Sequence, residues 1–460
     1  MTPTPTSGNG DGTGAAVDPV DRPGGFVSVD TIASAGPAGS AAPPVPGNSA
    51  DSTAPVDSAV SAVSADSADS ADSADSADSA DSVDALRAEV LRAHGAAGDV
   101  VAELLAYGRN RFSAPDTAAA LPLADEPFVA AWDGYAADAE REGVLPVLRR
   151  VLMQLAFPVA EGTGARADYQ AATRRGELPE GGSVNGGLAL LRPDGLRLLL
   201  HPTPAGRIPV LVTACREDFA ALVQALTRRN EPDAVPASMG AVIVGGYNNW
   251  ARVRALRSAW ESANPGAGAE GWAAEWRGIV PRKALYQDRF ILLSDGDYSA
   301  VPAADLELSA AEWTGLSLRI RLEHECCHYF TRRVFGSMHN SLHDELMADY
   351  SGLRAATGRF RADWFLRFLG LDVPEGRPGG RLENYLGDPP LGPSARAVLR
   401  SVLAAAARNL EALDRSGATG GDTPGERART LVALATLSVE ALASDASAAR
   451  FAAALPPEPA

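Results

Sequence analysis

The sequence predicts an α+β fold, with a mixed β-sheet packed against one long helix, a helical C-terminal region and a disordered N-terminal tail. Three observations lead to this prediction. Residues 1–82 are of low complexity, short apolar runs gather in residues 161–306, and helical patterns fill residues 83–160 and 307–460. Apolar residues three and four apart mark one face of a helix, whereas short apolar runs bounded by turn residues indicate strands. These four ranges are the predicted regions of the chain.

The N-terminal tail, residues 1–82, is acidic and repetitive. The triplet Ala-Asp-Ser repeats from Ala65 to Ser82, and the tail holds twelve aspartates and one arginine, a net charge of −11. It has few aromatic or branched apolar residues, so it cannot bury enough surface to offset the entropy lost on ordering. We therefore predict that the tail is disordered. The rest of the chain has a net charge of only about −6, which argues against nucleic acid as a partner because phosphate binding needs clustered lysine and arginine.

The ordered part is expected to begin near Val83. The string "VDALRAEVLRAHGAAGDVVAELLAYG" has the apolar spacing of one or two helices, and two more helical patterns follow near residues 126–142 and 144–156. This N-terminal helical region, residues 83–160, precedes the strands.

Strands and helices alternate in residues 161–306. "LALLRPDGLRLLLHP" predicts a hairpin that turns at Asp194-Gly195, and "RIPVLVTAC" and "YQDRFILLS" predict two further strands. "EDFAALVQALTRRN" predicts a helix. "MGAVIVGGYNNWARVRALRSAW" predicts a strand, a Gly-Gly turn and a helix.

Targeting signals and disulfides are not expected. No segment has the basic start and apolar run of a secretory signal, and none approaches the roughly 18 apolar residues of a membrane span. Of the three cysteines, Cys326 and Cys327 are adjacent and cannot easily bridge. The sequence therefore predicts a cytoplasmic protein without a membrane partner, and it contains no signal for an oligomeric state.

One long helix is expected between Ser309 and Gly336. "SAAE" at residues 309–312 is a capping box, in which the serine and glutamate side chains bind backbone N–H groups of the first turn. Gly336 follows two arginines and suits the C-terminal cap. His324 and His328 lie four apart on this helix, so both side chains can point at one ion. Zn²⁺ takes neutral imidazoles as ligands, and Glu325, about 100° further round, can reach a water on that ion.

A second helix is expected after a turn at residues 336–340. Ser341 or Asn340 can cap it, and Gly358 can end it. Glu345 and Asp349 lie four apart on one face of this helix. If the turn folds the second helix back against the first, Glu345 can be the third metal ligand, and Asp349 can accept the free N–H of a ligand histidine.

This pair of motifs, H-E-x-x-H followed by E-x-x-A-D, resembles the gluzincin class of zinc metallopeptidases, which includes thermolysin-like enzymes. The matching residues are His324, Glu325, His328, Glu345, Ala348 and Asp349. The string "HYFTRRVFGS" also resembles an uncharacterised bacterial family. The gluzincin resemblance covers about thirty residues and implies a zincin-like fold, with a strand layer on the first helix and a helical subdomain that carries the glutamate. A metzincin site is excluded, because Thr331 and Val334 stand where it needs a glycine and a histidine.

The resemblance also implies hydrolysis of a peptide or protein substrate by metal-activated water. Glu325 is expected to be the general base. A further donor should stabilise the oxyanion, and His339, His343, Tyr329 and Tyr350 are the candidates, of which we name His343 and Tyr350 as predicted catalytic residues. Cys327 either approaches the metal or packs against the sheet beside Cys326.

Two other readings of the sequence stay open. A zincin-like domain can bind a metal or a partner without catalysis, and such a site has no need of Glu325. A helical scaffold whose acidic tail recruits a partner would lose its function on removal of residues 1–82. For the substrate, "RFILLSDGDYS" is either an edge strand alongside which an extended peptide binds or a plain core strand.

Overall fold

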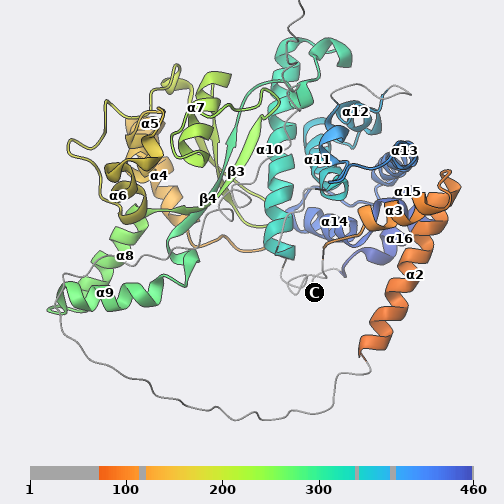
Figure 1. Ribbon diagram of the computed structural model, residues 1–460, viewed down its shortest axis with the longest axis horizontal. Helices are drawn as coiled ribbons and strands as arrows, with labels where there is room; N and C mark the ends of the chain where they lie inside the picture. The colour runs from red at the N-terminus through yellow and green to blue at the C-terminus, as the bar shows by residue number, and fades with distance from the viewer. Residues whose placement is uncertain (1–71, 113–120, 337–340, 373–379, 458–460) are drawn as a thin grey trace, which may run out of the picture.

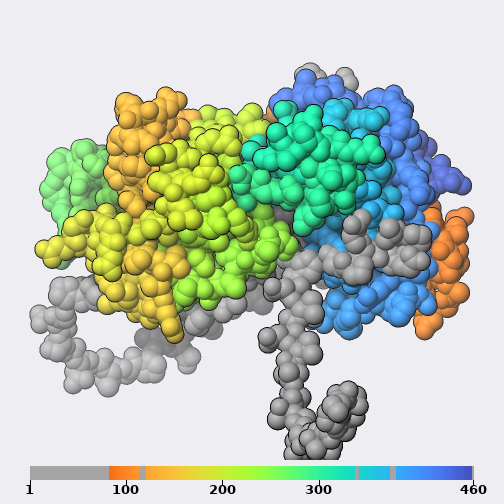
Figure 2. Space-filling view, turned by 90° about the horizontal axis from the view of Figure 1, so that it is seen from above, coloured from red at the N-terminus to blue at the C-terminus, as the bar shows by residue number. Residues whose placement is uncertain are grey.

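A computed structural model describes residues 72–112, 121–336, 341–372 and 380–457. Figure 1 shows an α+β arrangement in which helix α10 stands between a small sheet with its covering helices and a group of C-terminal helices. Figure 2, turned by 90°, shows the same division, with residues of the sheet half on one side and the C-terminal helices on the other. The α+β prediction is confirmed.

The sheet has four strands in the order β1-β2-β4-β3. The strands are β1 Arg197–His201, β2 Ile208–Val212, β3 Ala241–Asn248 and β4 Gln287–Leu293. β2 pairs antiparallel with β1 and parallel with β4, and β3 pairs antiparallel with β4. Because β4 has a neighbour on each side, it is a core strand, and of the two alternatives left open by the sequence the edge strand is excluded. Phe290–Leu293 is an unbroken apolar run and is buried throughout, as strands covered on both faces usually are.

The two faces of the sheet belong to two different cores. Val210, Ile291 and Leu293 pack into the core that contains α10, whereas their neighbours Leu211 and Leu292 pack into a second core on the opposite face. Successive side chains of a strand point to opposite faces, so the apolar run feeds both cores. The second core is covered by helices α4, α5 and α7.

Six helices belong to the sheet half. They are α4 Val129–Glu142, α5 Val144–Val151, α6 Ala167–Arg175, α7 Arg216–Thr227, α8 Trp250–Ala263 and α9 Gly268–Ile279. The helices expected near residues 126–142 and in "EDFAALVQALTRRN" are confirmed. The helix expected at 144–156 ends at Val151, and a short 3-10 helix follows at Met153–Ala156.

Two turn predictions in this half are wrong. The Asp194-Gly195 pair lies in a short 3-10 helix, and the hairpin is instead formed by β1 and β2. The chain does not turn at Gly245 and Gly246 but continues through both to Asn248, with a bulge at the glycines. Gly246 has a φ of +69°, a conformation that glycine adopts at little cost, which explains how the bulge is accommodated.

Helix α10 spans Ala310–Phe335, with Ser309 and Glu312 forming the capping box and Gly336 the left-handed cap. Both predicted ends are confirmed. α10 packs against β3 and β4 on one side and against α11 on the other. α11 spans Leu342–Thr357, begins at the cap Ser341 and ends at Gly358. Residues 337–340 of the predicted turn, with Asn340 and His339, lie outside the described residues.

Gly352 lets the two helices approach closely. A Cβ atom at this position would lie 2.5 Å from the backbone oxygen of Ile320 on α10. Real Cβ atoms do not come so near, so a larger residue at position 352 would force the helices apart. The absence of a side chain therefore sets the spacing of the helix pair that carries the predicted ligands.

The C-terminal helices are α12 Ala362–Phe368, α13 Pro393–Arg415, α14 Pro424–Thr436, α15 Val439–Ala443 and α16 Ser447–Ala454. Helices α2 (Asp72–Ala93) and α3 (Asp99–Tyr107) pack against α13 and α15. The predicted N-terminal helical region therefore divides, because α4 and α5 pack on the sheet instead. The region boundaries themselves stay predictions.

The tail prediction needs one correction. Residues 1–71 lie outside the described residues, but residues 72–82, also predicted to be disordered, form the first turns of α2. Extending an existing helix costs much less than starting one, so the docked part of α2 can propagate into the Ala-Asp-Ser repeat. None of the helices in the described part of the chain combines the length and apolar character needed to cross a membrane.

Candidate metal centre

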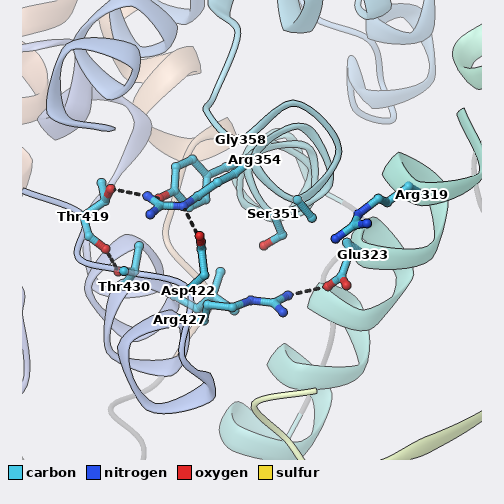
Figure 3. A pocket seen from close by; sticks show the side chains of 13 residues that line it. Arg319, Glu323, Ser351, Arg354, Gly358, Thr419, Asp422, Arg427 and Thr430 are labelled. Atoms are coloured by element: carbon cyan, nitrogen blue, oxygen red, sulfur yellow. Dashed lines mark hydrogen bonds and ion pairs between the residues drawn. The ribbon is translucent and has the colours of Figure 1, made fainter. Parts of the chain in front are cut away.

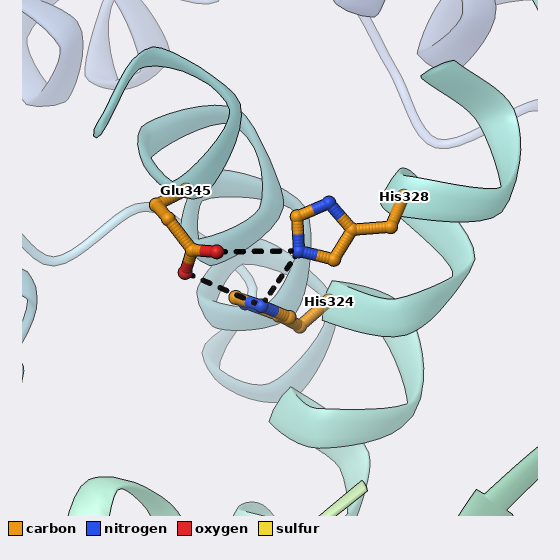
Figure 4. A group of neighbouring side chains, drawn as sticks. All are labelled: His324, His328 and Glu345. Carbon is orange, nitrogen blue, oxygen red and sulfur yellow. Dashed lines mark hydrogen bonds and ion pairs between the residues drawn. The ribbon is translucent and has the colours of Figure 1, made fainter. Parts of the chain in front are cut away.

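Three side chains from α10 and α11 converge between the two helices (Figure 4). The Nε2 atoms of His324 and His328 lie 3.1 Å apart, and they lie 3.6 Å and 3.5 Å from the two carboxylate oxygens of Glu345. All three side chains are at most 2% exposed. One donor atom from each lies within 4.8 Å of the others, so this group can hold a metal ion.

Helical periodicity explains the convergence. His324 and His328 are one turn apart on α10, and Asp349 is one turn beyond Glu345 on α11, so each pair shares a face. The close approach at Gly352 brings the two faces together.

Asp349 lies directly behind His324, as the sequence predicted. The Nδ1–H of His324 donates to Asp349 Oδ1 at 2.9 Å, and the hydroxyl of Tyr298 donates to the same oxygen at 2.5 Å. Arg381 pairs with the other oxygen, Oδ2, and donates to the hydroxyl of Tyr298 at 2.9 Å. Burial raises the pKa of Asp349, but Arg381 and His324 outweigh it and lower that pKa below its usual value. Because Nδ1 of His324 carries the proton, Nε2 keeps a free lone pair, and Nε2 is the atom that lies close to His328 and Glu345.

His328 has a carboxylate of its own behind the ring. Its Nδ1–H donates to Asp344 Oδ2 at 3.2 Å. Burial lowers the pKa of His328, but Asp344 and Glu345 outweigh it and raise that pKa well above its usual value. For Glu345 the signs are reversed. Burial raises its pKa, but His328, His324 and Arg381 outweigh the burial and lower that pKa to about 2. Without a metal ion, both shifts favour a proton on the imidazole of His328 over one on the carboxylate of Glu345.

Glu325 is buried beside the group and has an oxygen without a hydrogen-bond partner. Its Oε1 makes no hydrogen bond. Burial raises the pKa of Glu325, and the neighbouring histidines lower it in part. A buried carboxylate oxygen left unpaired is costly, so its presence here indicates that something else belongs next to it.

Tyr385 approaches the same group from the short helix η8, Arg381–Tyr385. Its hydroxyl is buried and makes no hydrogen bond. Burial and the nearby carboxylate of Glu345 raise the pKa of Tyr385 well above its usual value. The hydroxyl is therefore a neutral donor at the edge of the group.

The predicted oxyanion residues do not reach this group. His343 Nε2 donates to the backbone oxygen of Leu434, and the hydroxyl of Tyr329 donates to Glu126. Tyr350 donates to Asp414. Relative to Glu345, positions 343 and 350 are rotated by about 200° and 140° around α11, so their side chains leave from other faces. The predicted roles of His343 and Tyr350 are therefore corrected, and His339 lies outside the described residues.

Tyr350 belongs instead to a polar pocket of about 250 Å³ beside the same two helices (Figure 3). Arg354 pairs there with Asp414 and Asp422, and Arg427 pairs with Glu323. Cys326 and Cys327 lie in the apolar core that includes α10, which confirms that they pack rather than join the metal group.

Four residues around the group were missed in the sequence: Tyr298, Asp344, Arg381 and Tyr385. Asp344 directly precedes the predicted ligand Glu345, so its position and its carboxylate could have indicated a role beside the metal group. Tyr298, Arg381 and Tyr385 come from loops and short helices on either side of the helix pair. No spacing rule connects such residues to a helical motif.

The comparisons with known proteins place the chain in a family without assigning an activity. The model of a family of unknown function, DUF7005, matches residues 89–446. Because this match spans well over half of the chain, the protein belongs to that family. No curated protein and no solved structure matches the chain.

Proposed function

We propose that the protein is a zinc-dependent metallopeptidase of the gluzincin type, with His324, His328 and Glu345 as the metal ligands. The observation that carries the proposal is Glu325, a buried carboxylate with an unpaired oxygen beside a three-donor group. A base in that position is what hydrolysis by a metal-activated water requires.

The geometry and the charge of the group both suit Zn²⁺. Four ligands at about 2.1 Å in a tetrahedron lie about 3.4 Å from one another, and the donor atoms here are separated by 3.1 to 3.6 Å. Four carboxylates surround the group, those of Glu325, Asp344, Glu345 and Asp349, against the cations of Arg321 and Arg381. With neutral imidazoles this leaves a charge of −2, which a divalent cation balances.

The side chains then have distinct tasks. Bound zinc would polarise the substrate carbonyl and make water a stronger acid. Glu325 accepts the proton of the attacking water and delivers it to the leaving nitrogen. Asp349 and Asp344 hold the imidazoles in the ligand tautomer. The hydroxyl of Tyr385 takes the place that we first gave to His343 and Tyr350, as a donor toward the charge that develops on the carbonyl oxygen.

A non-catalytic metal site is the second candidate, and one observation favours it. His324, Glu325, His328 and Glu345 are all almost fully buried, as ligands of structural ions usually are. Structural zinc sites, however, are closed by four protein ligands. The described residues offer three, which leaves one position for water and favours catalysis.

The test is zinc content together with peptide hydrolysis. We expect about one zinc per chain in purified protein by elemental mass spectrometry, and cleavage of a peptide library by the wild type. Glu325→Gln should keep the zinc and lose at least about 100-fold in rate, because general bases contribute at least that much.

A folded protein without zinc would overturn the metal site. Zinc binding with no cleavage by the wild type, or equal cleavage by wild type and Glu325→Gln, would overturn the peptidase and leave the non-catalytic candidate.

A further inference from the structure

A large cavity lies between the N-terminal helices and the C-terminal half. It has a volume of about 1320 Å³ and is bounded by α3 with residues 108–112, the start of α11, η8 with the loop after it, and α13. Cavities for small ligands usually measure about 300–1,000 Å³. This one is larger, and a peptide of several residues is the kind of ligand that would fill it.

The cavity meets the metal centre at η8. This short helix supplies Arg381, which contacts Glu345 and Asp349, and Tyr385, which lines the cavity four residues later. Ser341 and Leu342 at the start of α11 also line the cavity, about one turn before Glu345. One end of the cavity therefore lies next to the metal ligands.

The wall combines apolar side chains with three unpaired polar atoms. Its apolar side chains include Leu104, Phe112, Leu342, Leu386, Leu399 and Val402. The hydroxyl of Tyr385, Nδ2 of Asn384 and Oε2 of Glu440 are buried there without a hydrogen bond. The first two are donors and the third is an acceptor, so an occupant with both carbonyl and N–H groups would satisfy them. A peptide backbone offers such groups while its side chains fill the apolar wall.

The residues 109–111 bring positive charge to the rim. Arg109 and Arg111 are exposed and make no ion pair among the described residues. Of the acidic residues in the wall, Glu383 pairs with Arg396, Glu440 pairs with Arg87, and Glu103 accepts the backbone N–H of Gly392. Asp388 has no ion-pair partner among the described residues, and Glu103 keeps its charge because a backbone N–H is neutral. Arg109 and Arg111 are therefore balanced by Glu103 and Asp388, and the rim has no net charge.

We propose that this cavity is the substrate-binding site of the metal centre and takes a peptide with apolar or aromatic side chains. The inference rests on the proposed peptidase function, but binding tests it without turnover. The N-terminal helix α3 is then part of the substrate site, although it lies more than two hundred residues before the metal ligands.

The experiment uses the zinc-loaded full chain with Glu325→Gln, immobilised and exposed to a random hexapeptide library. Retained peptides are sequenced by mass spectrometry. We expect enrichment of leucine, phenylalanine and tyrosine.

Two further variants in this background locate the binding. Ala106→Trp places a large side chain into the cavity from an exposed position of α3, and we expect it to reduce retention at least roughly tenfold. Ala102→Trp is the matched control, because Ala102 is exposed on the same helix but does not line the cavity.

The outcomes separate the two proposals. No retained peptides, no apolar bias, or equal retention by Ala106→Trp and Ala102→Trp would overturn the cavity as the substrate site. If peptides are retained selectively and Ala106→Trp abolishes this retention, but the wild type cleaves no peptide, the result would support the cavity as a peptide site and overturn the peptidase. If the wild type cleaves peptides and Ala106→Trp does not change the rate, the result would support the peptidase and overturn the cavity as the substrate site.

Discussion

Glu323 and His324 are neighbours on α10 but belong to two polar clusters, which differ in whether their buried carboxylates have partners. Glu323 accepts a hydrogen bond from His201 at 2.9 Å and pairs with Arg427, so both of its oxygens have partners. On the His324 side, the Oε1 atom of Glu325 has none. Buried charges are costly unless they are paired. The Glu323 cluster is complete as it stands, whereas the metal group becomes complete only with a cation.

Removing a ligand should have the largest effect. We expect Glu345→Ala to weaken zinc binding more than about 100-fold, because even residues behind metal ligands are worth 10- to 100-fold. Competition titration with a chromophoric chelator measures this. Glu323→Gln, which removes a buried glutamate of the same helix pair on the other side, should bind zinc like the wild type. Similar losses in both variants would mean that the two clusters are not distinct.

Removing the carboxylate behind His324 should have a smaller effect. Asp349→Asn keeps the shape but no longer favours the ligand tautomer of the imidazole, so zinc affinity should fall about 10- to 100-fold. The same titration applies, with melting temperature of the metal-free protein as a check on folding. Unchanged affinity would show that Asp349 pairs only with Arg381.

Zinc binding should also depend on pH. Asp344 and Glu345 raise the pKa of His328 well above its usual value, so the metal-free protein carries a proton there at neutral pH. Zinc needs the neutral imidazole and must displace this proton. Affinity should therefore rise about tenfold per pH unit up to the raised pKa of His328. Calorimetry in buffers of different ionisation enthalpy counts the proton released, and affinity that is flat between pH 6 and 8 would contradict the prediction.

The smallest effect on zinc, and a distinct effect on stability, is expected for Glu323→Gln. Burial raises the pKa of Glu323, but His201 and Arg427 outweigh the burial and lower that pKa below its usual value. A carboxyl with a lowered folded pKa stabilises the protein above its unfolded pKa, and this stabilisation is lost as the pH falls through the folded pKa. The variant should lose about 1–3 kcal/mol at pH 7 and less below pH 4. Urea unfolding at the two pH values measures the difference, and an equal loss at both would contradict it.

The sequence predicted the features that follow from local rules. Both ends of α10 and α11, and the positions of His324, His328, Glu345 and Asp349 on facing surfaces, follow from caps and from helical periodicity. The strands β2 and β4 follow from their apolar runs.

Features that depend on distant contacts could not be predicted. The place of β4 inside the sheet depends on its pairing with both β2 and β3, and the bulge at Gly246 looks like a turn in the sequence. Arg381 and Tyr385 reach the metal group from beyond residues 373–379, at a distance in the chain that no motif fixes. The prediction for Tyr350 relied on its being next to Asp349 in the sequence. On a helix, neighbouring residues are rotated by about 100°, so Tyr350 points away from the face that carries Asp349.

The contact between the first and last helices has a consequence for the order of events during synthesis. Arg87 on α2 pairs with Glu440, which follows 353 residues later. At translation rates of roughly 5–20 residues per second, α2 waits about 20 to 70 seconds for this partner. During that interval Val90 and Leu91, buried in the finished protein, can pack against α3 but not yet against α13 and α15. The N-terminal helices therefore complete their packing only after the last helices have been synthesised.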